Sequence, residues 1–264
     1  MTSGIDPDAN LQTIENAVAT ASAHGAVVLF TPEMALLLDR DRARARQWIE
    51  SAAPQETIDV LSQLARRASI DLTIGSLPMT RPNGKWVNRS LYFSAKQGLI
   101  ASYDKMHMFD VALPSGETWQ ESAAYEPGDA VVTVDPTPIG RLGLTICYDV
   151  RFPALFSALG NRLCDTIAVP AAFTKTTGKA HWHVLLRARA IEASAFVVAA
   201  AQVGSHEDGR ETYGHSVVID PWGDILLDMG GKDTGVAIVD IDLGRIAEVR
   251  SQLPSLANRR AMPN

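Results

Sequence analysis

The sequence predicts an α/β fold in which helices cover mostly buried strands. Segments with apolar residues at helical spacing alternate with short apolar extended runs along the whole chain. The run at 195–203 is almost entirely apolar, which is typical of a strand buried on both faces. A length of 264 residues, 46% of them hydrophobic, is enough for one large core, so a single domain over residues 1–264 is expected.

The first half of the chain alternates helical and extended patterns. A helix is predicted to begin after Pro7, which suits a first turn, and to end at Gly25. Its inner apolar residues are Leu11, Ile14, Val18 and Ala21. The elements predicted next are a strand at 26–30, a helix at 58–68, a strand at 70–77 and paired strands at 86–95 and 98–103. Residues 113–129 follow neither period, so we expect an ordered functional loop there.

The second half continues the alternation. The predicted strands are 130–134, 142–147, 164–169, 195–203, 213–219, 224–228 and 235–241, and the predicted helices are 154–163, 184–193 and 243–253. The strands at 213–219 and 224–228 are expected to pair, because Pro221 and Gly223 between them suit a tight turn. Leu155, Phe156 and Leu159 are expected to face the core.

Composition narrows the class of protein. Lysine and arginine number 24 against 30 acidic residues, a net charge of −6, and no basic run is present, so nucleic acid is not an expected partner. Two cysteines and the absence of a charged leader argue against a disulfide framework and a secretory signal. The longest uninterrupted apolar run, Ala195–Ala201, is too short to span a bilayer. We therefore predict a cytoplasmic protein without a membrane partner.

Cys147 stands where a predicted strand ends and a new helix begins, within the run Gly143–Pro153. The unpaired N–H groups of a helix start favour a thiolate, which makes this cysteine a candidate nucleophile. The alternative for any cysteine is a small buried hydrophobe. We interpret Cys164, which lies in an apolar strand, in that way.

Glu33 and Lys105 also follow predicted strands. Taken alone, Glu33 is equally explained as a glutamate in a first helical turn and Lys105 as an exposed lysine. Together with Cys147 they supply what amide hydrolysis needs, namely a base, a cation for the oxyanion and a nucleophile. The ammonium favours a thiolate and the carboxylate opposes it, so we expect Cys147 and Glu33 to share a proton.

Three runs around these residues resemble the signatures of the nitrilase superfamily of carbon–nitrogen hydrolases, and they are Pro32-Glu33, Tyr103–His107 and Cys147–Pro153. The resemblance covers nearly the whole chain. Further runs, such as Leu185–Glu192 and Tyr213–Ser216, are most similar to the branch that contains deaminated glutathione amidase. The resemblance implies a four-layer α-β-β-α sandwich, a homodimer or higher homo-oligomer, and catalysis with neither a metal nor another cofactor.

The resemblance also implies roles for individual residues. Glu33 would be the general base and acid, Lys105 would stabilise the oxyanion and the leaving group, and Cys147 would form a thioester. A second glutamate of the family matches Glu121, which would position Lys105 or the substrate. From the residues themselves, the backbone N–H of Tyr148 is a candidate oxyanion donor, since it follows a nucleophile at a strand-to-helix turn.

Arg187 is a candidate for a bidentate contact with a substrate carboxylate, although a structural ion pair with a neighbouring side chain explains it equally well. Two features depart from the relatives. They begin with a strand just before the residues that match Thr2-Ser3, and this sequence has no such strand. Either the chain continues upstream of Met1, or the strand is truly missing, in which case an unpaired sheet edge is expected near Glu33. Trp182-His183 stands where many relatives carry Trp-Glu. Because His181 and His183 are two residues apart, a helix points them in different directions and no zinc site is expected from this pair.

Three functions remain open on the sequence. The first is a thiol amidase that cleaves a small amide, such as a deaminated peptide or the monoamide of an α-keto dicarboxylate. The second is a nitrilase or N-carbamoyl amidohydrolase with the same three side chains. The third is a redox-sensing or binding protein that uses Cys147 without turnover.

Overall fold

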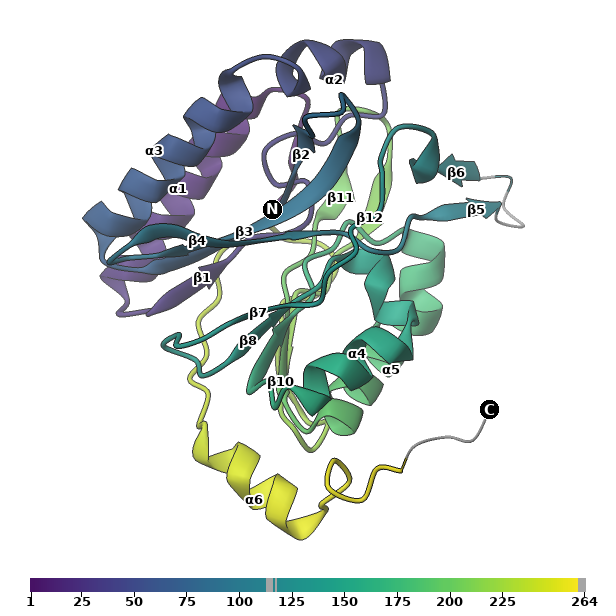
Figure 1. Cartoon of the computed structure of the whole chain (residues 1–264). Coiled ribbons are helices and arrows are strands. Elements are labelled where there is room, and N and C mark those ends of the chain that lie inside the picture. Colours follow the sequence, from purple (N-terminus) through teal and green to yellow (C-terminus); the bar gives the residue numbers. More distant parts are fainter. Residues whose placement is uncertain (113–115, 117, 261–264) are drawn as a thin grey trace.

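The structure, a computed structural model, describes residues 1–112, 116 and 118–260. Its helices are α1 (Pro7–Ala23), α2 (Arg42–Ile49), α3 (Ala53–Ala68), α4 (Pro153–Asn161), α5 (Lys175–Ala193) and α6 (Gly244–Gln252). Helices α1 and α3 cover the outer face of one sheet, and α4 and α5 cover the outer face of a second sheet (Figure 1). The four-layer α/β arrangement that the sequence predicted is confirmed.

The first sheet consists of β1 (Val28–Phe30), β2 (Asp71–Thr80), β3 (Trp86–Ser94) and β4 (Gly98–Asp104), in the order β1-β2-β3-β4. Strands β1 and β2 are parallel because α2 and α3 provide the crossover between them, whereas β2, β3 and β4 form antiparallel hairpins. The buried face of α3, with Ile58, Leu61 and Ala65, packs with α1 over this sheet. These elements agree with the predicted strands and with the predicted hairpin.

The second sheet consists of β7 (Val132–Val134), β8 (Leu142–Leu144), β9 (Thr166–Ala168), β10 (Phe196–Ala199), β13 (Val217–Ile219) and β14 (Ile225–Asp228), in the order β14-β13-β10-β9-β8-β7. Smaller elements are the pairs β5 (Asp110–Ala112) with β6 (Thr118–Gln120) and β11 (Val203–Ser205) with β12 (Glu211–Tyr213), and the 3-10 helices η1 (Glu121–Ala123) and η2 (Cys147–Arg151). The core between the two sheets joins Tyr92 and Tyr103 of the first sheet to Leu144 and Ile167 of the second.

Local sequence explains where α1 begins and ends. The carboxylate of Asp6 accepts hydrogen bonds from the N–H groups of Asp8 and Ala9, and Pro7 occupies the first helical position, where no N–H is required. Beyond the helix, Gly25 has a φ of +77°, a left-handed conformation that glycine adopts without steric cost.

Some predicted boundaries were wrong. Helix α2 was missed, because its arginine-rich sequence has little apolar periodicity and its first turn depends on the side chain of Asp41 as a cap. Helix α5 begins at Lys175, upstream of the predicted 184, and the apolar run at 195–203 divides into β10 and β11. The predicted loop at 113–129 contains β6 and η1, and residues 113–115 and 117 lie outside the described residues.

The predicted last strand at 235–241 is also wrong, since no strand is assigned there. Among the described residues, β1 has β2 as its only neighbouring strand, and a cavity of about 640 Å³ separates β1 from the 234–241 segment. The segment has no strand beside it with which to exchange hydrogen bonds, so its apolar residues do not make a strand. Within the described residues, β1 is the end strand of the first sheet, on the side of Glu33. None of the described helices combines the length and apolar character needed to cross a membrane.

Candidate active site

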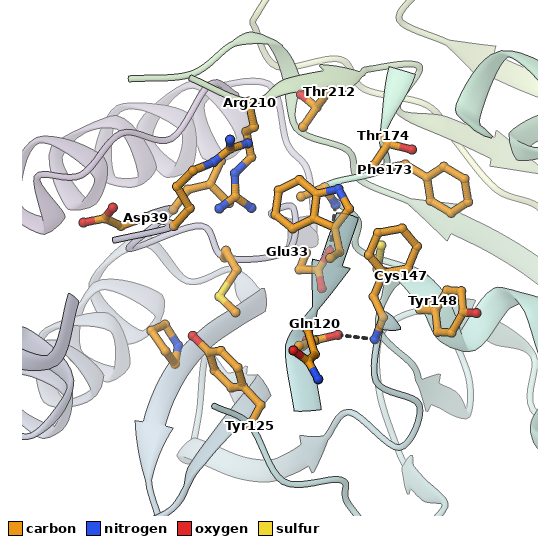
Figure 2. Close-up of a pocket in the computed structure, with 18 of the residues that line it drawn as sticks. Glu33, Asp39, Gln120, Tyr125, Cys147, Tyr148, Phe173, Thr174, Arg210 and Thr212 are labelled. Atoms are coloured by element: carbon orange, nitrogen blue, oxygen red, sulfur yellow. Dashed lines mark hydrogen bonds between the residues drawn. The ribbon is translucent and has the colours of Figure 1, made fainter. Parts of the chain in front are cut away.

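Glu33, Lys105 and Cys147 come together in one cavity of about 580 Å³, although they are far apart in the sequence. Glu33 follows β1 and Lys105 follows β4, both in the first sheet, whereas Cys147 follows β8 in the second. Glu33 and Cys147 lie next to each other, with Tyr148 beside Cys147 (Figure 2). All three predicted side chains are nearly inaccessible to solvent.

Lys105 is held between two carboxylates. Its Nζ lies 3.0 Å from Oε1 of Glu33, and 3.1 and 2.9 Å from the two carboxylate oxygens of Glu121. The lysine side chain is only 2% exposed. The pairing of Lys105 with Glu121 agrees with the positioning role that was expected for this second glutamate.

Two further groups hold the carboxylates in place. Nδ2 of Asn88, on β3, donates to Oε1 of Glu33 at 2.9 Å, and the backbone N–H of Ala172 donates to Oε2 at 2.8 Å. The backbone N–H of Phe109 donates to Oε2 of Glu121 at 2.7 Å. Sequence reasoning missed Asn88, because an asparagine in an apolar strand shows no motif and its partner lies 55 positions away.

Cys147 occupies a strained turn. It is the first residue of η2 and has a φ of +46°, a region that costs a residue with a side chain roughly 1–2 kcal/mol. Its backbone N–H donates to the carbonyl of Pro170, in the segment after β9, at 2.8 Å. This hydrogen bond holds the turn against that segment. The turn directs the thiol of Cys147 into the cavity, and the next residue, Tyr148, lines the same cavity.

Asp149 ties the cysteine turn to the lysine segment. Its fully buried carboxylate accepts from the hydroxyl of Tyr103 at 2.7 Å and from the backbone N–H of Ile146 at 2.8 Å. The other oxygen accepts from the backbone N–H of His107 at 3.1 Å and contacts its Nδ1 at 2.7 Å. One carboxylate thus links the residues that flank Cys147 to those that flank Lys105.

Glycine at position 75 permits a close approach to the turn that carries Glu33. A Cβ added there would lie 2.2 Å from the carbonyl oxygen of Thr31 and 2.4 Å from that of Pro32. Both are backbone atoms, which cannot move aside as a flexible side chain would. The hydroxyl of Thr31 also accepts from the N–H of Gly75 at 3.0 Å, so β2 supports the Glu33 turn directly.

The charges of the site determine the protonation of its acid and its cation. Burial alone would raise the pKa of Glu33, but the charge of Lys105 and hydrogen bonds from Cys147, Lys105 and Ala172 outweigh burial and hold that pKa below its usual value. Burial would lower the pKa of Lys105, but the charges of Glu121 and Glu33 raise it well above the usual value. Glu33 is therefore ionised and Lys105 protonated at neutral pH.

The thiol of Cys147 is different. Burial and the negative charge of Glu33 raise its pKa well above the ordinary value, and the opposing effect of Lys105 is smaller. Burial and Glu33 thus oppose the thiolate that Lys105 favours, and the expected sharing of the thiol proton with Glu33 stays a prediction. The thiol and the ionised carboxylate of Glu33 line the same cavity, so the carboxylate is placed to accept the thiol proton.

The comparisons with known proteins agree with this geometry. The sequence profile of the carbon–nitrogen hydrolase family matches residues 1–251. The chain belongs to the carbon–nitrogen hydrolase family. It is accordingly a hydrolase that acts on carbon–nitrogen bonds other than peptide bonds, and the family resemblance predicted from the sequence is confirmed.

Individual relatives are similar over almost the whole chain. The deaminated glutathione amidase of Synechocystis sp. is 40% identical over 98% of this chain and 95% of its own length. The NitFhit protein of C. elegans has a TM-score of 0.89 and 36% identity, and the match covers 98% of this chain but only 63% of that longer one. A nitrilase-superfamily amidase of Nesterenkonia sp. AN1 has a TM-score of 0.77 and 27% identity, over 96% of this chain and 95% of that chain.

The mouth of the cavity in this carbon–nitrogen hydrolase carries cations that the sequence analysis did not single out. The guanidinium groups of Arg40 and Arg210 lie 5.1 and 5.0 Å from the centre of the Trp119 ring. Asp208 pairs with Arg210 at 2.6 Å and lies 4.0 Å from Arg40, so one carboxylate faces two guanidinium groups. Both arginines line the cavity, where their guanidinium groups are available to an anionic group on a ligand.

The remaining predicted residues lie elsewhere. Arg187 is not among the described residues that line the catalytic cavity, and its Nε donates to the carbonyl of Gly223 at 2.7 Å. Cys164 is fully buried in the core, as expected. His181 contacts Arg151 and His183 contacts Asp228, so the two histidines do not share a site, as their spacing predicted.

We expect Asp149→Asn to lower the free energy of unfolding by about 2–4 kcal/mol, since the amide cannot accept all the hydrogen bonds that the buried carboxylate accepts. Urea unfolding followed by circular dichroism measures the change. The matched control is Asp233→Asn, at an exposed position, which should stay within about 0.5 kcal/mol of the parent protein. An equal stability of the two variants would contradict the linking role of Asp149.

Proposed function

We propose that this protein is a cysteine-dependent amidase that hydrolyses a small carboxylic amide through a thioester on Cys147. The observation that carries the proposal is the buried cluster in which Glu33 is paired with Lys105 at 3.0 Å and lines one cavity with Cys147. A related observation supports it. In the Nesterenkonia amidase, a mutant with glutamate changed to glutamine carries acrylamide added to the active-site cysteine.

In the first half of the reaction, Sγ of Cys147 attacks the amide carbon while Glu33 takes the thiol proton. The carbonyl oxygen becomes an oxyanion, which the ammonium of Lys105 and the backbone N–H of Tyr148 stabilise. Glu33 then gives the proton to the amide nitrogen, the C–N bond breaks, and the amine leaves. The acyl group remains on Cys147 as a thioester, and Glu33 is again ionised.

In the second half, water attacks the thioester carbon while Glu33 takes one of its protons. The oxyanion forms at the same place, close to Lys105. When it collapses, the C–S bond breaks, the proton returns to the sulfur of Cys147, and the carboxylic acid is released. The net reaction consumes one amide and one water and yields one acid and one amine or ammonia.

Glu121 acts on this reaction through Lys105. Its carboxylate contacts Nζ with both oxygens, whereas Glu33 contacts it with one. With two carboxylates beside it, the ammonium stays charged when Glu33 is transiently neutralised by the thiol proton. We therefore assign Glu121 the role of positioning Lys105 and maintaining its charge.

The cavity entrance supports a substrate that carries a carboxylate. A volume of about 580 Å³ suits a small molecule, and the guanidinium groups of Arg40 and Arg210 provide cations for a carboxylate at its far end. The similarity to deaminated glutathione amidases points in the same direction. We propose a deaminated glutathione or a similar ω-amide of a dicarboxylic acid as the substrate class.

Two alternative functions, a nitrilase or N-carbamoyl amidohydrolase and a redox sensor, are supported to different degrees. A nitrilase or an N-carbamoyl amidohydrolase would use the same three side chains, so only the products separate them from an amidase. A redox sensor is disfavoured, because sensor cysteines are accessible and have a lowered pKa, whereas the pKa of the buried Cys147 is raised.

The proposal includes self-association through α5 and the β13–β14 hairpin. Exposed apolar side chains gather there, and they are Val184, Ile191, Trp222, Ile225 and Leu226. A Cβ at Gly223 would touch Ile191, so the helix and the hairpin turn form one continuous surface. An apolar surface of this kind suits contact with a second copy of the chain, in a homodimer or higher homo-oligomer.

Cys147→Ala should reduce amide hydrolysis by at least about 10⁴-fold, because no other group in the cavity can form the acyl intermediate. Release of amine or ammonia from matched amides, nitriles and N-carbamoyl compounds measures the activity and separates the three reaction types by their products. Cys164→Ala is the matched control and should retain activity, since that thiol lies in the core. Full activity of Cys147→Ala would refute the mechanism.

The pH profile of kcat/KM should have its acid limb below pH 4.5. Glu33 acts as a base only when ionised, and its pKa is held below the usual 4.5, so activity disappears only as the pH falls through that lower value. Lys105 should cause no loss below pH 10.5, because its pKa is raised above that value. An uncharged aliphatic amide avoids titration of the substrate. An acid limb near pH 6 to 7 would be inconsistent with the assigned base.

Arg210→Gln should raise KM about 10-fold for an amide that carries a distal carboxylate and leave KM for an uncharged amide nearly unchanged, since one charged hydrogen bond contributes roughly 1.4 kcal/mol. Steady-state kinetics on the two substrates give the comparison. Arg141→Gln, at an exposed ion pair with Asp135, is the matched control. Equal changes for both substrates would show that Arg210 supports the cavity without recognising the carboxylate.

A further inference from the structure

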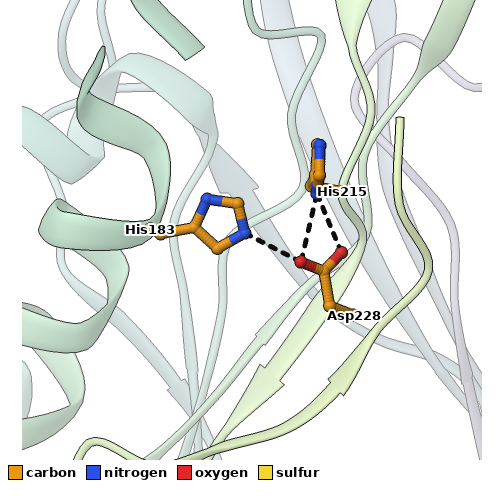
Figure 3. Close-up of side chains that lie close together, drawn as sticks. All are labelled: His183, His215 and Asp228. Atoms are coloured by element: carbon orange, nitrogen blue, oxygen red, sulfur yellow. Dashed lines mark hydrogen bonds and ion pairs between the residues drawn. The ribbon is translucent and has the colours of Figure 1, made fainter. Parts of the chain in front are cut away.

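A second cluster of polar side chains lies outside the catalytic cavity. Nε2 of His183, on α5, lies 2.9 Å from Oδ2 of Asp228, at the end of β14. Nδ1 of His215, just before β13, lies 2.9 Å from Oδ1 and 3.1 Å from Oδ2 of the same carboxylate. Figure 3 shows both rings beside the carboxylate of Asp228, with His183 to its left and His215 above it. None of the three residues lines the catalytic cavity.

We propose that His183, His215 and Asp228 bind a divalent transition-metal ion of the Zn²⁺ class. Their ligand atoms lie within 4.8 Å of one another. Two imidazole nitrogens and one carboxylate oxygen form a common zinc ligand set, and bond lengths of about 2.0–2.2 Å place tetrahedral ligand atoms roughly 3.3–3.6 Å apart. The present nitrogen–oxygen separations of 2.9 Å need to widen by only a few tenths of an ångström.

The backbone around the cluster fixes the direction of the ligands. His215 has a φ of +57°, and its N–H donates to the carbonyl of Gly230 at 2.8 Å. Its own carbonyl accepts from Nε1 of Trp182 at 2.8 Å. Oδ1 of Asp228 accepts from the N–H of Gly230 at 2.8 Å. Hydrogen bonds of this kind, made to the ligand residues by their neighbours, orient metal ligands and preserve their geometry.

The cluster is accessible enough for an ion to enter. The side chains of His183, His215 and Asp228 are 27%, 25% and 30% exposed, so a fourth position for water faces solvent. In the present arrangement a proton lies between each ring and the carboxylate. For a metal ion to bind, the proton of each neutral ring moves to the ring's other nitrogen, so Nε2 of His183 and Nδ1 of His215 become free to coordinate while both rings stay uncharged and no proton is released.

The site would add a metal link between parts of the fold that hydrogen bonds already join, such as that from Nε of Arg187 to the carbonyl of Gly223. His183 belongs to α5, whereas His215 and Asp228 flank the β13–β14 hairpin. The ring of Tyr213 stacks on His215 with centroids 4.4 Å apart, and the N–H of Tyr213 donates to the carbonyl of Phe173, a residue of the catalytic cavity wall. A bound ion therefore acts as a clamp between α5 and the hairpin, close to that wall.

The metal affinity should be measured in the Cys147→Ala background, so that the catalytic thiol cannot serve as a ligand. Competition of the protein with a chromogenic chelator for Zn²⁺ at neutral pH should show one ion per chain. Because loss of outer contacts alone lowers metal affinity roughly 10- to 100-fold, His183→Gln and Asp228→Asn should each lower it by at least 10-fold. His181→Gln, on the same helix but outside the cluster, is the matched control and should leave the affinity unchanged.

Cobalt provides a second readout. Co²⁺ bound by the cluster should give the intense visible absorption of a tetrahedral site, and this absorption should disappear in His183→Gln. The ion should also raise the midpoint of thermal unfolding of the Cys147→Ala protein but not that of the double variant with His183→Gln. Circular dichroism of His183→Gln establishes that the variant is folded.

Two results would overturn the proposal. One is the absence of a stoichiometric Zn²⁺ ion in the Cys147→Ala protein, and the other is a Zn²⁺ affinity that His183→Gln and Asp228→Asn leave unchanged. Either result would make the cluster a set of hydrogen bonds to Asp228 alone. Both are measured without turnover, so the outcome is independent of whether the proposed amidase activity is correct.

Discussion

The buried ammonium of Lys105 is the constraint on which the catalytic site depends. A cation that is 2% exposed is stable only if its charge is compensated, and removal of one partner from a buried pair costs roughly 3–5 kcal/mol. Glu33 and Glu121 provide that compensation from different segments, one after β1 and one after β6. The charge therefore obliges these segments to converge, and the catalytic geometry is a condition of stable folding as well as of reaction.

The same charges explain why the site rests with a neutral thiol. Two carboxylates around one ammonium leave the cluster with an excess negative charge, so a thiolate on Cys147 would add a second unit in a desolvated place. In the proposed mechanism, proton transfer to Glu33 during attack avoids this, because the negative charge passes from the carboxylate through sulfur to the carbonyl oxygen. The negative charge moves from one group to the next beside Lys105, and the number of charged groups in the cavity stays constant.

The three residues of the proposed reaction could be predicted from the sequence more readily than the residues that hold them in place. Glu33, Lys105 and Cys147 were predicted because each follows a strand and carries recognisable chemistry. Asn88 and the cations at the entrance were missed, since their roles depend on partners distant in the sequence and on no local motif. Helix α2 was missed for lack of apolar periodicity, and the segment at 235–241 has the composition of a strand but no neighbour to pair with.

Glu33 follows β1, which has only β2 as a neighbouring strand among the described residues. Its position must therefore be fixed by other contacts. Its carboxylate is held by Asn88 from β3 and by the N–H of Ala172 from the second sheet's connections, and its carbonyl accepts from Nε2 of Gln202 at 3.0 Å. The close approach of Gly75 fixes the turn from the β2 side. Glu33 is therefore held between the two sheets, and the position of its carboxylate depends on how these sheets pack.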